Sequence, residues 1–233
     1  MFTKSWICFL AVAVALFVAG TAQAMLINYD AGGNLPTGAG VVGATGDQWN
    51  QSTGNSGWHA SSTSSLATLF DSSGTTITGA ALTCTRNGLG SNDWAGVGGG
   101  PGPTSNPNPF DFSLGYGGSS NTLSWAVSGL STTTSYDVYV FWGYSAHANG
   151  SASVNGSASQ TFTYADATSL PVDGRDYRLF SGITATGGVI TISSPGSDSN
   201  AGISGFQITP EPATMALLGL GGLGVLLRRK RSK

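Results

Sequence analysis

The sequence predicts an all-β fold, a two-sheet β-sandwich, for the central part of the chain. The region from Met25 to Thr209 is rich in Gly, Ser, Thr and Asn, and short runs of β-branched and aromatic residues lie between its turn clusters. No window in it has a convincing apolar repeat of 3.6 residues, so helices are not expected. About ten such runs along 185 residues are enough for two packed sheets around a sizeable core.

The expected strands follow one another through this region. They are 25–29, 40–42, 76–85, 122–127, 136–144, 151–154, 160–164, 177–180, 189–193 and 203–208. The strongest is 136–144, because it is apolar on both alternating faces after Asp137, as is typical of a strand in the middle of a sheet. The polar stretch 128–135 before it predicts either a hairpin turn or a connection between the two sheets.

The N-terminal end has the features of a secretory signal peptide. Lys4 precedes an apolar run over 6–19, and Ala22-Gln23-Ala24 has the A-x-A form of a signal-peptidase site. Cleavage by signal peptidase after Ala24 would make Met25 the first mature residue. The expected organisation is a signal peptide over 1–24, an exported β-sandwich domain over 25–209 and a C-terminal segment over 210–233.

The C-terminal segment combines three features in a fixed order. Pro210-Glu211-Pro212 precedes the uncharged run 213–227, and a basic cluster of Arg228, Arg229, Lys230 and Arg231 follows it. As a helix the run would measure about 22 Å, less than the hydrocarbon core of about 30 Å. Long basic side chains can extend its span to the headgroups, so we expect a short transmembrane helix with the basic cluster in the cytoplasm. Pro210 and Pro212 should break regular structure just outside the membrane and leave an extended segment there that is accessible to a processing enzyme.

This tail closely resembles the PEP-CTERM sorting signal of bacterial exported proteins. The resemblance implies recognition by an exosortase, a membrane protease-transferase, and delivery to the cell surface or the exopolysaccharide matrix. The C-terminal helix would then anchor the chain in the inner membrane only transiently. Within the core, the stretch 128–139 is similar to a connector of exported β-sandwiches, and the closing run 203–208 to the last strand of galactose-binding-like jelly rolls. These likenesses imply a jelly-roll-like sandwich and no particular ligand.

The charge of the core limits its partners. Between Met25 and Thr209 there are three Arg, ten Asp and neither Lys nor Glu, which gives a formal charge of −7. Phosphate contacts need clustered cations, so we expect no binding to nucleic acid. Cys84 is the only cysteine of this region, so no disulfide can form within it, and a small buried side chain is the expected role.

No group of residues in the sequence predicts catalysis. Asp166, Asp173 and Asp176 form the one local group of carboxylates. The preference of Asp for turns explains their presence as well as a catalytic role in a glycosidase would. A Ser-His-Asp triad stays open because His59 and His147 are present, but the Gly-x-Ser-x-Gly context is absent. We therefore expect no catalytic residues, no enzyme activity and no cofactor.

A structural calcium ion is the one metal that stays open. Asp30, Asp47 and Asp198 are candidate ligands, although their spacing is not diagnostic. Two distant His and one Cys do not form a recognisable zinc site.

Aromatic residues give the remaining functional signal. Trp125 and Trp142 lie within strong strands, whereas three other tryptophans lie in or beside Gly-, Ser- and Asn-rich segments. An exposed ring there can cover the C–H face of a sugar while neighbouring polar groups bind its hydroxyls, although such rings can also close the ends of a sandwich. The candidate glycan-binding residues are Trp49, Trp58, Trp94, Asn50 and Asp93.

Together these observations favour a non-catalytic exported protein that associates with glycan or with the cell envelope. Two alternatives stay open: a carbohydrate-active hydrolase or lyase of the same architecture, and a purely structural surface protein.

Overall fold

The computed structural model describes residues 25–30, 40–51, 63–87, 114–115, 122–143, 150–163, 172–195 and 202–211. Leu26–Pro210 form one compact unit, and Met1–Met25 with Glu211–Lys233 form a second, of which only Met25 and Glu211 are described. Among the described residues there is no helix of the length and apolar character needed to cross a membrane. The expected signal peptide over 1–24 and the expected transmembrane helix over 213–227 lie outside these ranges.

The first sheet is organised around the last strand of the compact unit. Its order is β12 (Tyr177–Thr184), β9 (Ser135–Gly143), β14 (Gly202–Pro210), β1 (Ile27–Asp30) and β2 (Asn50–Gln51), and β7 (Leu114–Gly115) also pairs with β14. The pairings are antiparallel except that of β1 with β2. The prediction that 136–144 lies in the interior of a sheet is confirmed, since β9 has β12 on one side and β14 on the other.

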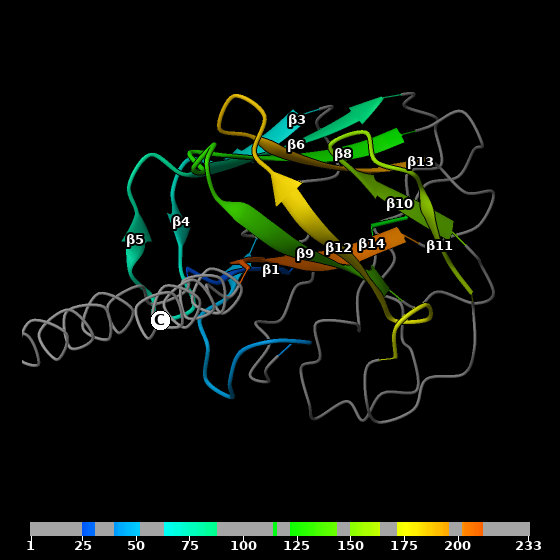
Figure 1. Cartoon of the computed structure of the whole chain (residues 1–233), viewed down its shortest axis with the longest axis horizontal. Coiled ribbons are helices and arrows are strands. Elements are labelled where there is room, and N and C mark those ends of the chain that lie inside the picture. Colours follow the sequence, from blue (N-terminus) through cyan, green and yellow to red (C-terminus); the bar gives the residue numbers. More distant parts are fainter. Residues whose placement is uncertain are drawn as a thin grey trace, which may run out of the picture. The chain divides into compact units, whose positions relative to one another are not determined.

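The second sheet is antiparallel throughout. Its order is β11 (Gln160–Phe162), β10 (Gly150–Val154), β13 (Ile190–Pro195), β8 (Thr122–Ser128), β6 (Ala81–Asn87) and β3 (Thr63–Leu66). β4 (Leu69–Phe70) and β5 (Thr76–Ile77) form a separate two-stranded hairpin. In Figure 1 the β3-β6-β8-β13 layer lies over the β1-β14-β9-β12 layer.

Apolar side chains from the facing surfaces of the two sheets form the core. The Trp142 ring of β9 stacks on the Phe162 ring of β11, with centroids 4.7 Å apart and an interplanar angle of 15°. Other fully buried members are Ile27, Leu82, Leu123, Trp125, Val127, Val138, Val140, Ile190, Ile192, Phe206 and Ile208. The predicted all-β, two-sheet sandwich is thereby confirmed. Trp125 and Trp142 lie in strands, as predicted, and both are buried.

The polar stretch 128–135 connects the two sheets and is not a hairpin turn, because β8 and β9 belong to different sheets. Gly129 has a φ of 78°, which favours glycine. The buried Tyr136 hydroxyl accepts a hydrogen bond from the Ser131 amide at 3.0 Å, and this bond fixes the corner in the manner of the tyrosine corners of other sandwiches.

Two expected strands differ from the structure. Residues 40–42 form no strand, since the amides of Val41 and Val42 donate to the Gln207 side chain instead of to a neighbouring strand. The expected strand 76–85 is divided into β5 and β6 by a turn at Gly79, whose φ is 78°. Four short strands, β2, β3, β4 and β7, were not predicted.

Candidate binding face and sorting segment

The outer face of the first sheet is the face turned away from the second sheet, and it has two halves. On β1 and β14 it is covered by the segment 40–51. Gln207 is fully buried there: its Oε1 accepts from the Val41 and Val42 amides at 2.8 and 3.1 Å, and its Nε2 donates to Asn28 Oδ1 at 2.7 Å and to the Val42 carbonyl at 2.8 Å. Since the Gln207 amide is hydrogen-bonded at both ends, this half is a structural layer.

Trp49 and Asn50, which were expected to contact a ligand, are both buried. Trp49 is only 2% exposed, and its ring centroid lies 6.2 Å from that of Phe141 in β9. Asn50 is 4% exposed; its Nδ2 donates to the carbonyls of Asn28 and Phe70 at 3.0 and 2.7 Å, and its Oδ1 accepts from the Phe70 amide at 2.8 Å. The expectation that Trp49 offers an exposed ring to a sugar is wrong, because Phe141 and the sheet occupy its surroundings. Trp58, Trp94 and Asp93 lie outside the described residues.

The other half of the outer face, on β9 and β12, carries a pair of half-buried tyrosines. Tyr139 and Tyr177 have ring centroids 6.0 Å apart at an angle of 49°. Tyr177 lies opposite Phe141, and Leu179 lies opposite Tyr139, so these side chains share one face. Asp137 precedes Tyr139 by two positions and therefore points to the same side. The structure thus brings two aromatic rings and a carboxylate together on a partly exposed surface.

The phenol of Tyr139 stays protonated at neutral pH. Its burial raises its pKa, and the charges of Asp137 and Tyr177 raise the pKa further. A protonated phenol can donate a hydrogen bond as well as accept one. Sequence reasoning missed this pair, because the two tyrosines are 38 positions apart and meet only through the pairing of β12 with β9. The alternation of side chains within 136–144 places Tyr139 on the opposite face of the strand from Val138 and Val140. This alternation was the one feature of the sequence that indicated the face on which Tyr139 lies.

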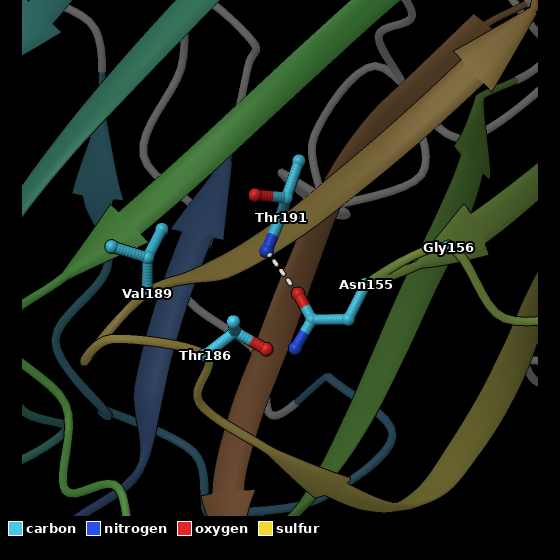
Figure 2. Close-up of a pocket in the computed structure, with 5 residues that line it drawn as sticks. All are labelled: Asn155, Gly156, Thr186, Val189 and Thr191. Carbon is cyan, nitrogen blue, oxygen red and sulfur yellow. Dashed lines mark hydrogen bonds between the residues drawn. The ribbon is translucent and has the colours of Figure 1, made fainter.

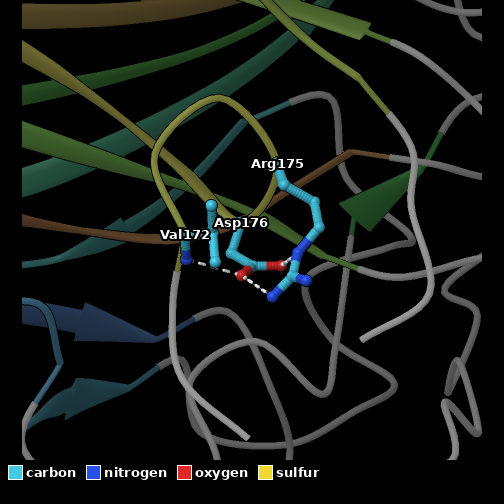
Figure 3. A network of polar contacts seen from close by, with 3 residues as sticks. All are labelled: Val172, Arg175 and Asp176. Atoms are coloured by element: carbon cyan, nitrogen blue, oxygen red, sulfur yellow. Dashed lines mark hydrogen bonds and ion pairs between the residues drawn. The ribbon is translucent and has the colours of Figure 1, made fainter. Parts of the chain in front are cut away.

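The acidic loop 172–176 is held together by ion pairs (Figure 3). Arg175 donates from Nε to Asp176 Oδ1 at 2.8 Å and from Nη2 to Asp176 Oδ2, and the Val172 amide donates to the same Oδ2 at 2.7 Å. The hydrogen bond with Asp176 raises the pKa of Arg175. Arg178 lies 3.6 Å from Asp173 and donates to the Thr161 carbonyl at 2.7 Å. Both described carboxylates therefore fix the loop; Asp166, His59 and His147 lie outside the described residues.

An open hollow of about 330 Å³ lies between the turn that follows β10 and the turn that joins β12 to β13 (Figure 2). Its lining residues are Asn155, Gly156, Thr186, Val189 and Thr191. Asn155 Oδ1 accepts from the Thr191 amide at 2.7 Å, and its Nδ2 donates to the Thr184 carbonyl at 2.9 Å. Because both ends of the amide are used inside the protein, Asn155 joins the turns and presents little to a ligand.

The calcium candidates are not assembled into a common site by the residues that the structure describes. Among those residues there is no group of three His, Cys, Asp or Glu side chains that could hold a metal. Asp30 is 2% exposed and accepts from Gln51 Nε2 at 3.2 Å, and Asp47 accepts from the Ala44 amide at 2.9 Å. Asp198 lies outside the described residues, so calcium binding stays a prediction.

Comparison with known proteins identifies the tail. Residues 209–231 match the PEP-CTERM protein-sorting motif. No curated protein matches the chain. A GH26-CBM35 β-(1,4)-mannanase of Podospora anserina is a solved structure with 12% identity and a TM-score of 0.33 over 55% of this chain; the matched region spans 28% of the mannanase chain.

The fold and the tail together define an exported β-sandwich protein. More particularly, the chain carries a PEP-CTERM sorting motif, which directs it to an exosortase for processing and to the cell surface. One detail of the expected tail is corrected. Pro210 does not lie in a segment outside the fold, because it is the last residue of β14, opposite Tyr136 of β9.

Proposed function

We propose that the exported core is a non-catalytic glycan-binding domain, and that it binds neutral or weakly basic glycan on the outer face formed by β9 and β12. After sorting, this binding would keep the protein associated with the exopolysaccharide or the cell envelope. The observation that supports the proposal is the half-buried pair of Tyr139 and Tyr177, which lies beside Asp137.

The chemistry of this face suits a sugar. Aromatic rings gain from apolar C–H contact and dispersion, whatever the net charge of the protein. The Tyr139 phenol can donate and accept hydrogen bonds, and the Asp137 carboxylate can accept from sugar hydroxyls. The formal charge of −7 on the core disfavours polymers rich in uronate or sulfate. One or two rings on an open face should give dissociation constants between millimolar and micromolar, about −4 to −8 kcal/mol.

The acidic loop supports binding in preference to catalysis. A glycosidase needs two opposed carboxylates with a sugar between them. Asp173 and Asp176 instead face the guanidinium groups of Arg178 and Arg175, and the Asp176 carboxylate also holds the Val172 amide. Carboxylates used in this way stabilise a turn.

The test is retention of the exported protein in native gels that contain a neutral polysaccharide, with binding constants taken from the shift in mobility. We expect Tyr139→Ala and Tyr177→Ala each to weaken retention about tenfold, because each loses stacking area. Phe70→Ala is the matched control, since Phe70 is a 37% exposed aromatic residue on β4 and should leave retention unchanged. Retention that survives both tyrosine replacements, or that rises as salt is lowered, would overturn the proposal.

A further inference from the structure

Six aspartates lie among the described residues, and Asp137 differs from the other five. The five whose carboxylates form hydrogen bonds or ion pairs with described groups are Asp30, Asp47, Asp71, Asp173 and Asp176. The Asp137 side chain has neither a hydrogen bond nor an ion pair with any described residue. Its negative charge is therefore not neutralised within the described part of the fold, and its oxygens can accept from a ligand.

Small neighbours leave the Asp137 carboxylate open to the outer face. Its partner in β14 is the half-buried Thr209. On the other side, the register shift in the pairing of β12 with β9 places the exposed residues 181–182, a Ser and a Gly, opposite it. Bulges of this kind interrupt the ladder of a sheet, and here the interruption adjoins a half-buried carboxylate. A ligand can therefore approach Asp137 without displacing a large side chain.

The two tyrosines beside this carboxylate can bind a cation. The Tyr139 and Tyr177 rings are half-buried, with centroids 6.0 Å apart. The pKa of Tyr139 is raised by its burial and then by the charge of Asp137, so the carboxylate lies close enough to act on the phenol. Aromatic faces attract cations, and a nearby carboxylate adds to the attraction. This combination suits a ligand that carries a positive charge on a partly apolar body.

The arginines of the loop and strand next to this face are already engaged. Arg175 is paired with Asp176, and Arg178 lies 3.6 Å from Asp173. The formal charge of −7 on the core attracts cationic ligands and repels anionic ones. The group on a glycan that matches these charges is a free amine, because it becomes a cation on protonation.

We propose that the glycan bound by this face contains an amino sugar with a free, protonated amine. The ammonium group pairs with the Asp137 carboxylate, and the sugar ring packs on Tyr139 and Tyr177. An N-acetylated sugar keeps the ring contact and loses the ion pair, because its amide nitrogen carries no charge. An exposed ion pair and a cation–π contact together should favour the free amine about tenfold in dissociation constant. This inference rests on the proposed function and names the sugar class for the same site.

The test compares probes that differ only in acetylation: a β-(1,4)-linked glucosamine oligomer and its fully N-acetylated counterpart of equal length. Dissociation constants for the exported protein are measured by isothermal titration calorimetry at a mildly acidic pH, where the free amines are protonated. We expect the glucosamine oligomer to bind about tenfold more tightly. The preference should shrink as salt is raised, because salt screens an exposed ion pair.

Asp137→Asn separates this carboxylate from the diffuse charge of the core. We expect the ratio of the two dissociation constants to fall from about ten to about one. A loss of hydroxyl contacts that weakens both probes alike cancels in this ratio. The matched control is Asp71→Asn, which removes the same charge from the turn of the β4–β5 hairpin and should keep the tenfold preference.

The outcomes distinguish this inference from glycan binding itself. Equal binding of both probes by the unmodified protein, or a preference that survives Asp137→Asn, would overturn the inference. If both probes bind equally and their binding is lost in Tyr139→Ala, the preference for the amine alone is wrong. If neither probe binds and neutral polysaccharide does not retain the protein, the proposed function is wrong as well.

Discussion

At the scale of single residues, the structure depends on a few large contacts between the sheets. Trp142 is the clearest example, because its ring stacks on Phe162 of the opposite sheet. Gly150 lies so close that an added Cβ would come within 1.9 Å of the Trp142 ring. A glycine in β10 is therefore required for close approach of the ring, and a tryptophan in β9 is required to fill the space.

We predict that Trp142→Ala destabilises the core by about 3 to 5 kcal/mol, because a large buried ring is replaced by a cavity. Phe70→Ala serves as the control; that side chain is 37% exposed, so its loss should cost less than about 1 kcal/mol. Urea unfolding followed by fluorescence and circular dichroism measures both values. Equal losses in the two variants would contradict the packing assigned to Trp142.

Gln207 is the residue on which the buried polar layer depends. We predict that Gln207→Met costs about 2 to 4 kcal/mol: the volume is kept, but the Val41 and Val42 amides and Asn28 Oδ1 lose a buried partner. The same change at Gln160 is the matched control, because that side chain is half-buried and donates one bond, to the Leu179 carbonyl at 3.1 Å. Gln160→Met should cost about 1 kcal/mol. Thermal and urea unfolding of the two variants test this order.

At the scale of elements, the β4–β5 hairpin shows how a polar turn attaches a short strand pair to the sandwich. Asp71 Oδ1 accepts from the Ser73 amide, the Ser73 hydroxyl and the Thr75 amide at 2.9, 2.6 and 2.9 Å. The Ser72 amide donates to the Leu26 carbonyl at 2.8 Å, so the turn is tied to the chain beside β1. Burial is the largest single effect and raises the pKa of Asp71, but the three hydrogen bonds together outweigh it and lower the pKa below its ordinary value.

The hairpin should therefore contribute stability that depends on pH. A carboxyl whose pKa is lower in the folded state stabilises the fold above its ordinary pKa of about 3.9, and this contribution is lost as the pH falls through the folded value. Asp71→Asn keeps the acceptor oxygen and removes the charge. We predict that the variant is less stable than the unmodified protein at pH 6, and that the difference shrinks as the pH falls through the lowered pKa of Asp71 in the folded state. Urea unfolding of both proteins across this range measures it; a difference independent of pH would contradict the assignment.

Long strands were predictable from the sequence, whereas short ones and their contacts were not. β8, β9, β10 and β14 have enough alternating or apolar residues to identify them, and each was predicted within two residues at each end. β2, β4 and β7 have two residues each, so no periodicity can reveal them. Trp49 was expected at the surface because its neighbours are polar. Its burial depends on Phe141, a partner 92 positions away, which only the pairing of strands brings near.

At the scale of the whole chain, the protein combines an acidic core with a basic tail. The core has a formal charge of −7, and the whole sequence only −2, because the basic residues are concentrated at the ends. Under the proposed function, retention uses aromatic side chains for contact with glycan, whereas the expected sorting uses the positive charge of the tail for orientation in the membrane. The tail was identified from its sequence alone, since the order of its three parts is enough. The pair of Tyr139 and Tyr177 could be recognised only from the fold, because the pairing of β12 with β9 brings the two residues together.

The basic cluster should determine whether the tail is presented to the exosortase in the correct orientation. The uncharged run 213–227 is short for a span, so Lys and Arg at its end must retain that end in the cytoplasm. We predict that replacing Arg228, Arg229, Lys230 and Arg231 together with Ser lowers the fraction of processed protein and its surface yield. Replacing the three arginines with Lys keeps the charge and should leave both quantities unchanged. Pulse-chase labelling with surface biotinylation measures them, and equal processing of the Ser and Lys variants would mean that charge does not orient the tail.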